Sequence, residues 1–426
     1  MNFKAFNMRV RALAVWGVAG LGFALPMPTA WTNIMLILIL AGWLGSGGWH
    51  SKWQAVRQAP AAMAAFAFIA LVLVGLLYGN GNYGSHYLSK YASLLIIPLV
   101  LSLQLDHREQ WLAIDAFCAA MALILALSIL IWLQWIPASL FKGSEAGNPI
   151  VFKLHITHGV FMALAAFLLG VRAQQFKASP AKYWPLVAIA SLMLINALFM
   201  VRGRTGQLIV VILLVYLFHL RFPRYGLLIG ALCAGLLGTA AYNISPAFKE
   251  RADLAAEEAV RWSDTRGDTT SSIGTRLDYY VTTLSIIKEH PLIGVGTKGF
   301  PDAYEKQVEG TQLQPSNNPH NQYLLVMAQY GLIGLAALLG LYGACGRQAR
   351  RQPAPFAMLA TGILLAYVAG NLFNSFMLDF SERVFFAWSL GLLLSAAPTN
   401  ILLHNQLRPA QSANGVPDMD KQRCNN

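Results

Sequence analysis

The chain has 426 residues, of which 56% are hydrophobic and 12% are charged, and an ordinary soluble domain carries roughly twice that charged fraction. This composition excludes a disordered chain and argues against a soluble enzyme. The formal net charge is +12, but the basic residues are scattered singly or in pairs between apolar runs. Because they form no continuous basic face, we expect no nucleic-acid partner and predict that they set membrane topology instead.

Apolar runs long enough for membrane helices recur along the whole chain. At about 20 apolar residues for each span, the composition is sufficient for about twelve, and we predict an all-α integral membrane protein with about 12 transmembrane helices. The runs lie near residues 12–25, 29–45, 61–78, 88–104, 112–136, 157–171, 184–201, 206–220, 226–243, 321–345, 354–376 and 384–397. The first resembles a signal peptide, but the next run follows so closely that we expect a retained helix.

The basic residues also predict the orientation. If the amino terminus is cytoplasmic, most of them outside the long loop fall on the cytoplasmic side, as the positive-inside rule requires. The predicted domains are then residues 1–243 with nine spans, residues 244–320 as one large helical outer loop, residues 321–400 with three spans, and a polar cytoplasmic tail at 401–426. Both termini are predicted to be cytoplasmic.

The outer loop has the pattern of ordered helices. Residues 249–262 predict a helix lying at the interface, 272–289 a second helix that stops before Pro291, and 301–309 a short third one. In the second helix we expect one apolar stripe. It comprises Leu277, Tyr280, Val281, Leu284 and Ile287. The segment GVGTKGF at 294–300 formally matches a dinucleotide fingerprint, but no βαβ unit surrounds it, so we interpret its glycines as turns.

Two arginines lie at the outer end of the seventh predicted helix, against the topological bias. Arg202 and Arg204 either reach toward lipid head groups or bind an anion, since a guanidinium matches phosphate oxygens with a planar fork. Gly203 and Gly206 are expected to let a ligand approach the backbone. Arg204, which begins the eighth predicted helix, is the better candidate.

Arg276 and His320 are the next candidates along the chain. Arg276 forms either a surface ion pair with Asp278 or a second fork for the same ligand. His320 is predicted in the first turn of the tenth membrane helix, where it is either an interfacial residue or a base. The positive helix end should keep its ring neutral, and a neutral imidazole can accept a proton from an attacking hydroxyl.

Three further residues begin the sixth predicted helix. His155 and His158, at i and i+3, can share a metal, but no carboxylate or cysteine nearby completes a ligand set, so we expect interface or substrate contacts for them and for Lys153. We expect neither a metal nor a cofactor. Loop aromatics such as Trp262, Tyr279 and Tyr280 are expected either to line the site or to pack in the core.

Four segments together resemble the bacterial O-antigen ligases. They are HNQYLLVMAQYGLIGL at 320–335, GRTGQ at 203–207, GTR at 274–276 and GVGTKGF at 294–300. The broader superfamily includes O-antigen polymerases and protein O-oligosaccharyltransferases. The resemblance implies a C-type glycosyltransferase-like architecture in the inner membrane of a Gram-negative cell. It further implies transfer of a glycan from undecaprenyl diphosphate to an acceptor on the periplasmic side, without a metal. For ligases that acceptor is a sugar hydroxyl of the lipid A–core oligosaccharide.

The resemblance also implies roles for particular residues. The family's loop arginine falls on Arg276 and its histidine on His320. Its membrane-end arginine falls on Arg204, although Gly203 stands where members often have serine, which leaves Arg202 as the alternative. We expect the arginines to hold the diphosphate while His320 orients or deprotonates the acceptor in an inverting displacement. Asn321 is a further possible substrate contact.

Three other functions remain open from sequence. An O-antigen polymerase would use the same donor with a lipid-linked repeat as acceptor, and a protein O-oligosaccharyltransferase would be a longer chain. A lipid or sugar transporter would show inverted repeats and charged groups near mid-membrane, and none is evident in the predicted spans. The partners that we expect are therefore the undecaprenyl-diphosphate-linked donor, the lipid A–core acceptor and membrane lipids.

Overall fold

The computed structural model describes residues 3–244, 246–262, 264, 266–267 and 271–395. Within these residues every regular element is a helix, apart from one isolated bridge between Glu145 and Asn148. The predicted tail at 401–426 lies outside the described residues. The first half of the chain forms α1 (Phe3–Ala24), α2 (Thr29–Gly45), α3 (Trp49–Gln58), α4 (Pro60–Tyr78), α5 (Gly84–Tyr91), η1 (Ala92–Leu95), α6 (Ile96–Leu101), α7 (His107–Trp132), η2 (Ala138–Leu140), α8 (His155–Gln174) and α9 (Pro180–Ile195).

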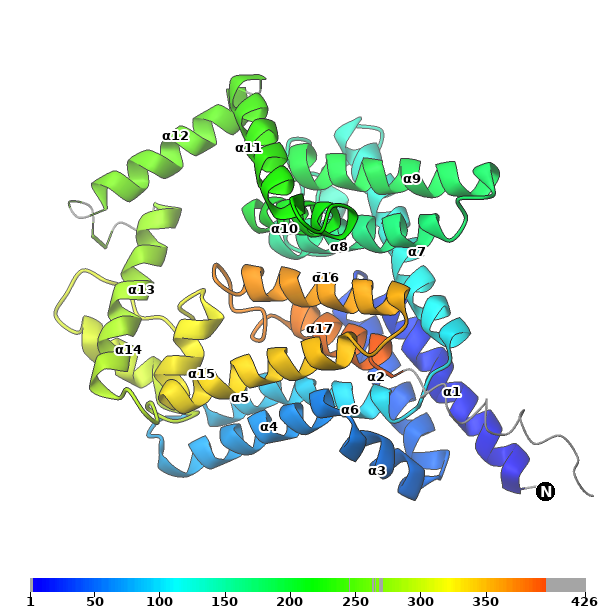
Figure 1. Ribbon diagram of the computed structural model, residues 1–426. Coiled ribbons are helices and arrows are strands. Elements are labelled where there is room, and N and C mark those ends of the chain that lie inside the picture. Colours follow the sequence, from blue (N-terminus) through cyan, green and yellow to red (C-terminus); the bar gives the residue numbers. More distant parts are fainter. Residues whose placement is uncertain (1–2, 245, 263, 265, 268–270, 396–426) are drawn as a thin grey trace, which may run out of the picture.

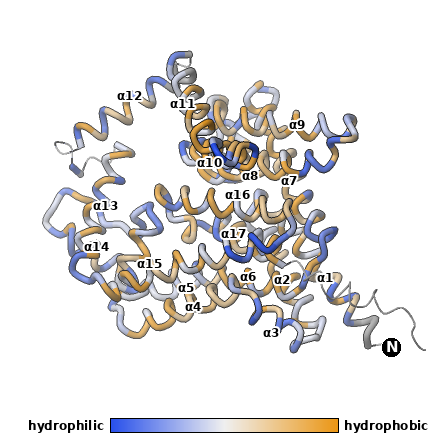
Figure 2. Tube along the Cα trace, viewed as in Figure 1, coloured by the Kyte–Doolittle hydropathy of each residue, from blue (hydrophilic) through white to orange (hydrophobic). Residues whose placement is uncertain are grey.

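The second half contains the remaining elements. They are η3 (Asn196–Met200), α10 (Arg204–Arg221), α11 (Gly226–Ile244), α12 (Pro246–Arg261), α13 (Ser272–Glu289), α14 (Phe300–Val308), α15 (Gln322–Ala349), α16 (Ala354–Gly370) and α17 (Phe380–Leu393). In Figure 1, α4, α15 and α16 run in roughly the same direction, with α13 and α14 at one end and α3 at the other. Hydrophobic residues follow the length of these long helices (Figure 2).

The helices agree with an integral membrane protein. Each predicted apolar run coincides with helix over most of its described residues, while residues 396–397 of the last run lie outside them. Among the described residues, six helices are long and apolar enough to cross a membrane, or seven if the bent pair α2 and α3 is one span. The run at 88–104 is divided among α5, η1 and α6, and the apolar stretch of α11 at Gly226–Leu236 is shorter than a span. The count of twelve therefore stays a prediction. The three loop helices predicted at 249–262, 272–289 and 301–309 match α12, α13 and α14.

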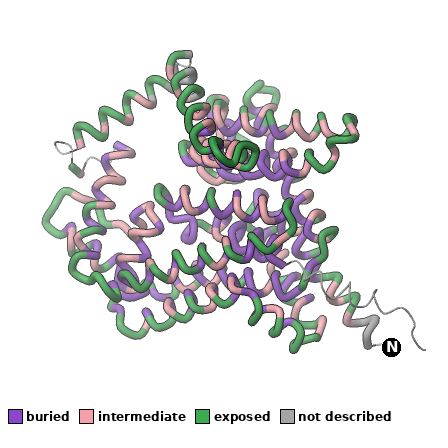
Figure 3. Tube along the Cα trace, viewed as in Figure 1, coloured by how far each residue is buried: buried purple, intermediate pink, exposed green. Residues whose placement is uncertain are grey.

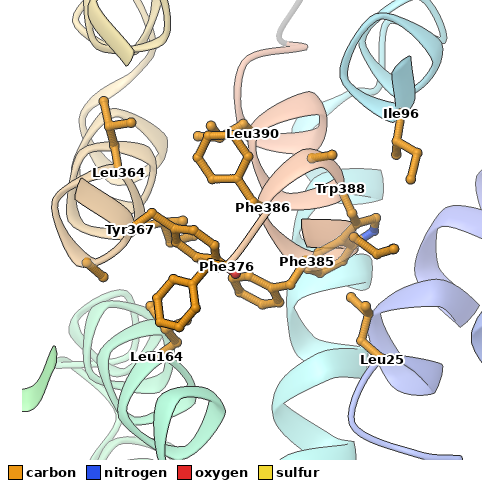
Figure 4. Close-up of a cluster of buried hydrophobic side chains, with 14 of the residues drawn as sticks. Leu25, Ile96, Leu164, Leu364, Tyr367, Phe376, Phe385, Phe386, Trp388 and Leu390 are labelled. Carbon is orange, nitrogen blue, oxygen red and sulfur yellow. The ribbon is translucent and has the colours of Figure 1, made fainter. Parts of the chain in front are cut away.

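The core is built around α17, which is almost wholly buried and mostly apolar beyond its first turn, as expected of a central helix. In Figure 4 Phe385 of α17 lies beside Tyr367 of α16 and Phe376 of the connection, and Trp388 of α17 lies beside Phe385. The Trp388 indole donates a hydrogen bond to the carbonyl of Val18, 3.0 Å away. In contrast, α11 and α12 are largely exposed (Figure 3). The core therefore fixes the connection between α16 and α17, which reaches the candidate site.

One membrane helix is broken and repaired by the glycine loop. Within α15, Gly331 has φ 61° and ψ −153°, which interrupts the helical hydrogen bonds. Val295 N and Gly296 N donate to the carbonyls of Ala328 and Gln329, while Leu332 N donates to Pro291 O. Unsatisfied backbone is too costly at membrane depth unless protein partners supply the bonds. The segment GVGTKGF is thus a turn, as predicted, and its function here is to complete a broken helix.

This repair makes a stability prediction. Gly331→Ala is expected to lower the unfolding midpoint in detergent, because a Cβ there would lie 2.2 Å from the Leu292 carbonyl carbon and a positive φ alone costs about 1–2 kcal/mol. The matched control is Gly340→Ala in the same helix, where a Cβ would meet nothing within 4 Å and alanine favours helix. A thermal scan in which both variants unfold like the parent protein would contradict the assignment.

The predicted apolar stripe runs along one side of α13, but it is only partly buried. Val281 and Leu284 are 37% and 42% exposed, whereas Thr282 and Thr283 are buried. The Thr283 hydroxyl donates to the carbonyl of Tyr279 at 2.6 Å, so a polar residue fits the packed face without an unsatisfied group. At a membrane rim, exposed apolar side chains are normal, and apolar periodicity does not identify the packed face.

Candidate functional site

A pocket of about 370 Å³ lies where α10, α13 and the α16–α17 connection meet. Arg204 begins α10 directly after its N-cap Gly203, and Arg276 lies in the first turns of α13. Both arginines line the pocket, although the sequence separates them widely. Its remaining walls are mostly apolar. They are Thr205, Leu208, Ile273, Leu277, Tyr280 and Phe373.

Neither pocket arginine is neutralised by a carboxylate. Among the described residues no carboxylate oxygen lies within 4.0 Å of Arg204 or Arg276. Burial lowers the pKa of Arg276, and the charge of Arg204 acts in the same direction while the Tyr280 phenol opposes it. A guanidinium remains charged even so. Two like charges beside an apolar wall are costly without a counter-charge, so the pocket is suited to an anion.

Asp278 does not form the surface ion pair with Arg276 that the sequence offered as an alternative. It is 5% exposed, accepts from the Trp262 indole at 2.8 Å, and lies 3.5 Å from the Arg266 guanidinium. Residues two apart on a helix point in different directions. The Asp278 carboxylate therefore binds Trp262 and Arg266, which precede α13, and Arg276 stays available to a ligand.

His320 lies before α15 and outside its first turn. The N-cap of α15 is Asn321, and His320 adopts φ 52°. Burial, and then the charge of Arg276, lower its pKa. Both effects favour the neutral ring at neutral pH, the state that the sequence predicts.

His320 is joined to the pocket through two tyrosines. The Tyr280 phenol, which lines the pocket, donates weakly to the His320 carbonyl at 3.4 Å. The Tyr279 ring is stacked on the imidazole with 5.8 Å between centroids. His320 itself does not line this pocket. The imidazole lies beside the pocket, and its ring nitrogens form no hydrogen bond with a described residue.

Asn321 forms side-chain hydrogen bonds at the start of α15. Its side-chain oxygen accepts from Tyr323 N and Leu324 N, each at 3.0 Å, and its amide donates to Leu372 O at 2.9 Å. These bonds anchor the start of α15 to the α16–α17 connection. The sequence treated Asn321 as a possible substrate contact, whereas the geometry gives it a positioning role.

Arg202 pairs with a carboxylate outside the pocket that Arg204 lines. Its guanidinium lies 3.7 Å from the Glu145 carboxylate, and its backbone N–H donates to the Asn148 side chain at 3.0 Å. It does not line the pocket. Of the two arginines that the sequence left open, the geometry favours Arg204.

Gly203 and Gly206 serve helix packing, so the interpretation that they let a ligand approach is wrong. A Cβ at Gly206 would lie 2.6 Å from the backbone carbon of Gly159, and one at Gly203 would lie 2.8 Å from the carbonyl oxygen of His155. Small residues of this kind let two membrane helices cross closely. The glycines thus hold the amino end of α10, and with it Arg204, against α8.

Of the residues near the start of α8, His158 is buried, whereas His155 and Lys153 are partly buried. His158 is 2% exposed, and its two ring nitrogens bond to Val151 N at 3.3 Å and to the Asn196 side chain at 3.1 Å, which leaves none for a substrate or a metal. His155 lies close enough to Arg276 to feel its charge. Burial lowers the pKa of Lys153 to about 8.

Sequence reasoning missed the contribution of the α16–α17 connection. Asn374 donates to the Thr205 hydroxyl at 2.7 Å, Leu372 O accepts from Asn321 and Tyr280, and Phe373 lines the pocket. Nearby, Glu382 is 1% exposed and one of its oxygens has no partner among the described residues. The only sequence signal was a pair of asparagines, Asn371 and Asn374, at the end of an apolar run.

The comparisons with known proteins agree with the motifs. Residues 189–339 match a family model described as O-antigen ligase, a range that contains Arg204, Arg276 and His320. The chain is also similar to an uncharacterized protein of Haemophilus influenzae, with 28% identity over 201 residues, which is 45% of this chain and 50% of that relative. The chain thus covers about half the length of the relative. The family match confirms the resemblance to O-antigen ligases.

Proposed function

We propose that this chain, whose residues 189–339 match the O-antigen ligase family, moves O-antigen polysaccharide from undecaprenyl diphosphate to a sugar hydroxyl of lipid A–core oligosaccharide. Family membership supports a membrane glycosyltransferase of the ligase or polymerase type. The observation that carries the finer proposal is the pair of guanidiniums, Arg204 and Arg276, which line one pocket and have no carboxylate partner among the described residues. With both termini cytoplasmic, this pocket faces the periplasm.

The two arginines would act on the leaving group. As the bond between the anomeric carbon and the diphosphate breaks, its electron pair moves to a phosphate oxygen and negative charge grows there. Preorganised donors stabilise such charge most where water is excluded. Arg204 and Arg276 supply the positive charge that a divalent ion supplies in other transferases, and the apolar wall beside them suits the polyprenyl chain.

His320 would act on the acceptor. The acceptor oxygen forms the new bond to the anomeric carbon while its proton passes to the neutral imidazole, or is held by it during attack. The residues that line the pocket include no carboxylate nucleophile, so we propose a single displacement with inversion. A glycan trapped covalently on the purified enzyme would contradict that step.

The assay that tests the proposal supplies undecaprenyl-diphosphate glycan to the purified protein with one of two acceptors. Extension of lipid A–core supports the ligase, whereas extension of a lipid-linked repeat unit would identify a polymerase. Movement of the donor across reconstituted vesicles without a new glycosidic bond would favour a transporter. Transfer that is undiminished in EDTA is expected if the arginines alone neutralise the diphosphate.

The lowered pKa of His320 predicts the acid limb of the pH profile. Only the neutral ring can accept a proton, so transfer is retained at neutral pH and falls as the pH drops through the pKa of the folded protein. Because burial and Arg276 lower that pKa below its usual 6.5, the midpoint is expected below pH 6.5. Initial rates between about pH 5 and 8 test this, with the exposed His290→Gln variant as control. A midpoint above 6.5 would remove His320 as the titrating base.

A further inference from the structure

The end of the molecule opposite the arginine pocket has a second hollow, which the proposed transfer reaction does not use. Between α2, α3, α4 and α6 lies an apolar cavity of about 410 Å³. We call it the tryptophan groove, after Trp43, Trp49 and Trp53 in its wall. It forms where α2 and α3 meet at a bend of 116°, at the end of the molecule marked by α3 in Figure 1.

A polar pocket continues the groove. The polar pocket has a volume of about 250 Å³ and shares Lys52 and Ser102 with the tryptophan groove. Its wall also contains Asn7, Arg11 and Ser46. An apolar trough therefore opens into a polar, basic pocket, and Lys52 lies at the junction of the two.

Lys52 is a buried cation whose hydrogen-bond and ring contacts are all with neutral groups. Its side chain is among the buried ones, with 8% of the residue exposed. The ammonium donates to the carbonyl of Trp43 and, at 2.9 Å, to the Ser46 hydroxyl. It lies 5.0 and 4.9 Å from the ring centroids of Trp43 and Trp49. These groups are all neutral, and one of the three ammonium hydrogens remains for a ligand.

Arg11, the other cation in the polar pocket, is already paired. Its two terminal nitrogens bond to the two Glu109 oxygens at 2.8 and 3.0 Å. Among the described residues no carboxylate lies within 4.0 Å of the Lys52 ammonium. Lys52 therefore provides the uncompensated positive charge of the polar pocket. The ligand that complements the groove and the pocket together is an anion with an apolar chain attached.

We propose that this hollow binds an anionic glycerophospholipid, with an acyl chain in the tryptophan groove and its phosphate beside Lys52 in the polar pocket. A lipid fits both halves, whereas free phosphate would occupy only the polar one. The site is separate from the arginine pocket, because the length of α4 lies between them. This helix starts at Pro60 beside α3, and it ends at Tyr78, whose hydroxyl donates to Ile293 O of the loop. Tryptophans and a lysine are the residues expected where a lipid head group meets its chains.

Native mass spectrometry of the full-length, delipidated protein tests the proposal. It is titrated separately with dioleoyl phosphatidylglycerol, dioleoyl phosphatidylcholine and inorganic phosphate. Phosphatidylglycerol is expected to be retained about fivefold better than phosphatidylcholine, the effect of one cation on an anionic lipid. Equal retention of the two lipids, or retention of phosphate alone, would overturn the proposal.

Two variants address the two halves of the site. Lys52→Gln removes the charge, and Leu40→Trp fills the groove from an exposed position while leaving Lys52 bonded to α2. Both are expected to lose the preference for phosphatidylglycerol. Arg57→Gln is the matched control, since Arg57 is an exposed cation of the same helix that lines neither hollow. Parent-like lipid retention by the folded Leu40→Trp variant would refute the site even if Lys52→Gln fails to fold.

Discussion

Arg204→Gln and Arg276→Gln are each expected to reduce glycan transfer to lipid A–core by at least about 100-fold, the usual cost of removing one donor that stabilises a developing oxyanion. Both guanidiniums line the same pocket and pair with no carboxylate in the part of the chain that the structure describes, so either change leaves one cation to hold the diphosphate. Arginine-to-lysine changes at the same positions should restore only part of the rate, because lysine keeps the charge but loses the planar fork. Initial rates with saturating donor measure both effects.

The matched control for this experiment lies two residues away. Arg202→Gln makes the same change in charge at an exposed arginine that pairs with Glu145, and transfer is expected to stay within about twofold, as for an exposed ion pair. Thermal unfolding in detergent must show that each variant is folded. Loss of transfer in Arg202→Gln with full transfer in Arg204→Gln would reverse the assignment of the two residues.

His320→Asn is expected to lower transfer by about 100-fold to 10,000-fold, the range for a general base. Asparagine is the informative substitute because it tolerates the left-handed backbone that His320 adopts at φ 52°, as few other residues do. The change therefore removes the imidazole and spares the turn before α15. The rate of transfer to lipid A–core measures the loss.

Binding of the donor distinguishes chemistry from misfolding in this variant. His320→Asn should still bind undecaprenyl-diphosphate glycan, because Arg204 and Arg276 are unchanged, and the unfolding midpoint should stay close to that of the parent protein. Tyr279→Leu, which removes the ring stacked on His320, should reduce transfer less. Full turnover of His320→Asn would show that the imidazole has no part in the reaction.

Local pattern predicted much of the helical architecture. The runs at 29–45 and 61–78 are reproduced almost to the residue by α2 and α4, and the loop segment 272–289 is α13 itself. These segments are identified by apolar length and by stop signals such as Pro291, which act within a few residues. The run at 88–104 was less well predicted, since its division into α5, η1 and α6 follows from its packing on α4 and α17.

The candidate site was predictable as a set of residues but not as an arrangement. Motif and charge singled out Arg204, Arg276 and His320, whereas nothing local showed that Asp278 turns toward Trp262 and Arg266. The same holds for Gly206, whose role is a close contact with Gly159. Each of these outcomes depends on a neighbour far away in the sequence.

The amino-acid sequence by itself determined that the chain is a helical membrane protein with an ordered loop, because bilayer insertion and helix formation respond to the composition of neighbouring residues. Only the tertiary structure decided that Arg204 lines the pocket while Arg202 pairs with Glu145, and that the glycine loop repairs α15. Long-range packing selects which side chains meet, and the free energy of such contacts is set by geometry that no local pattern contains.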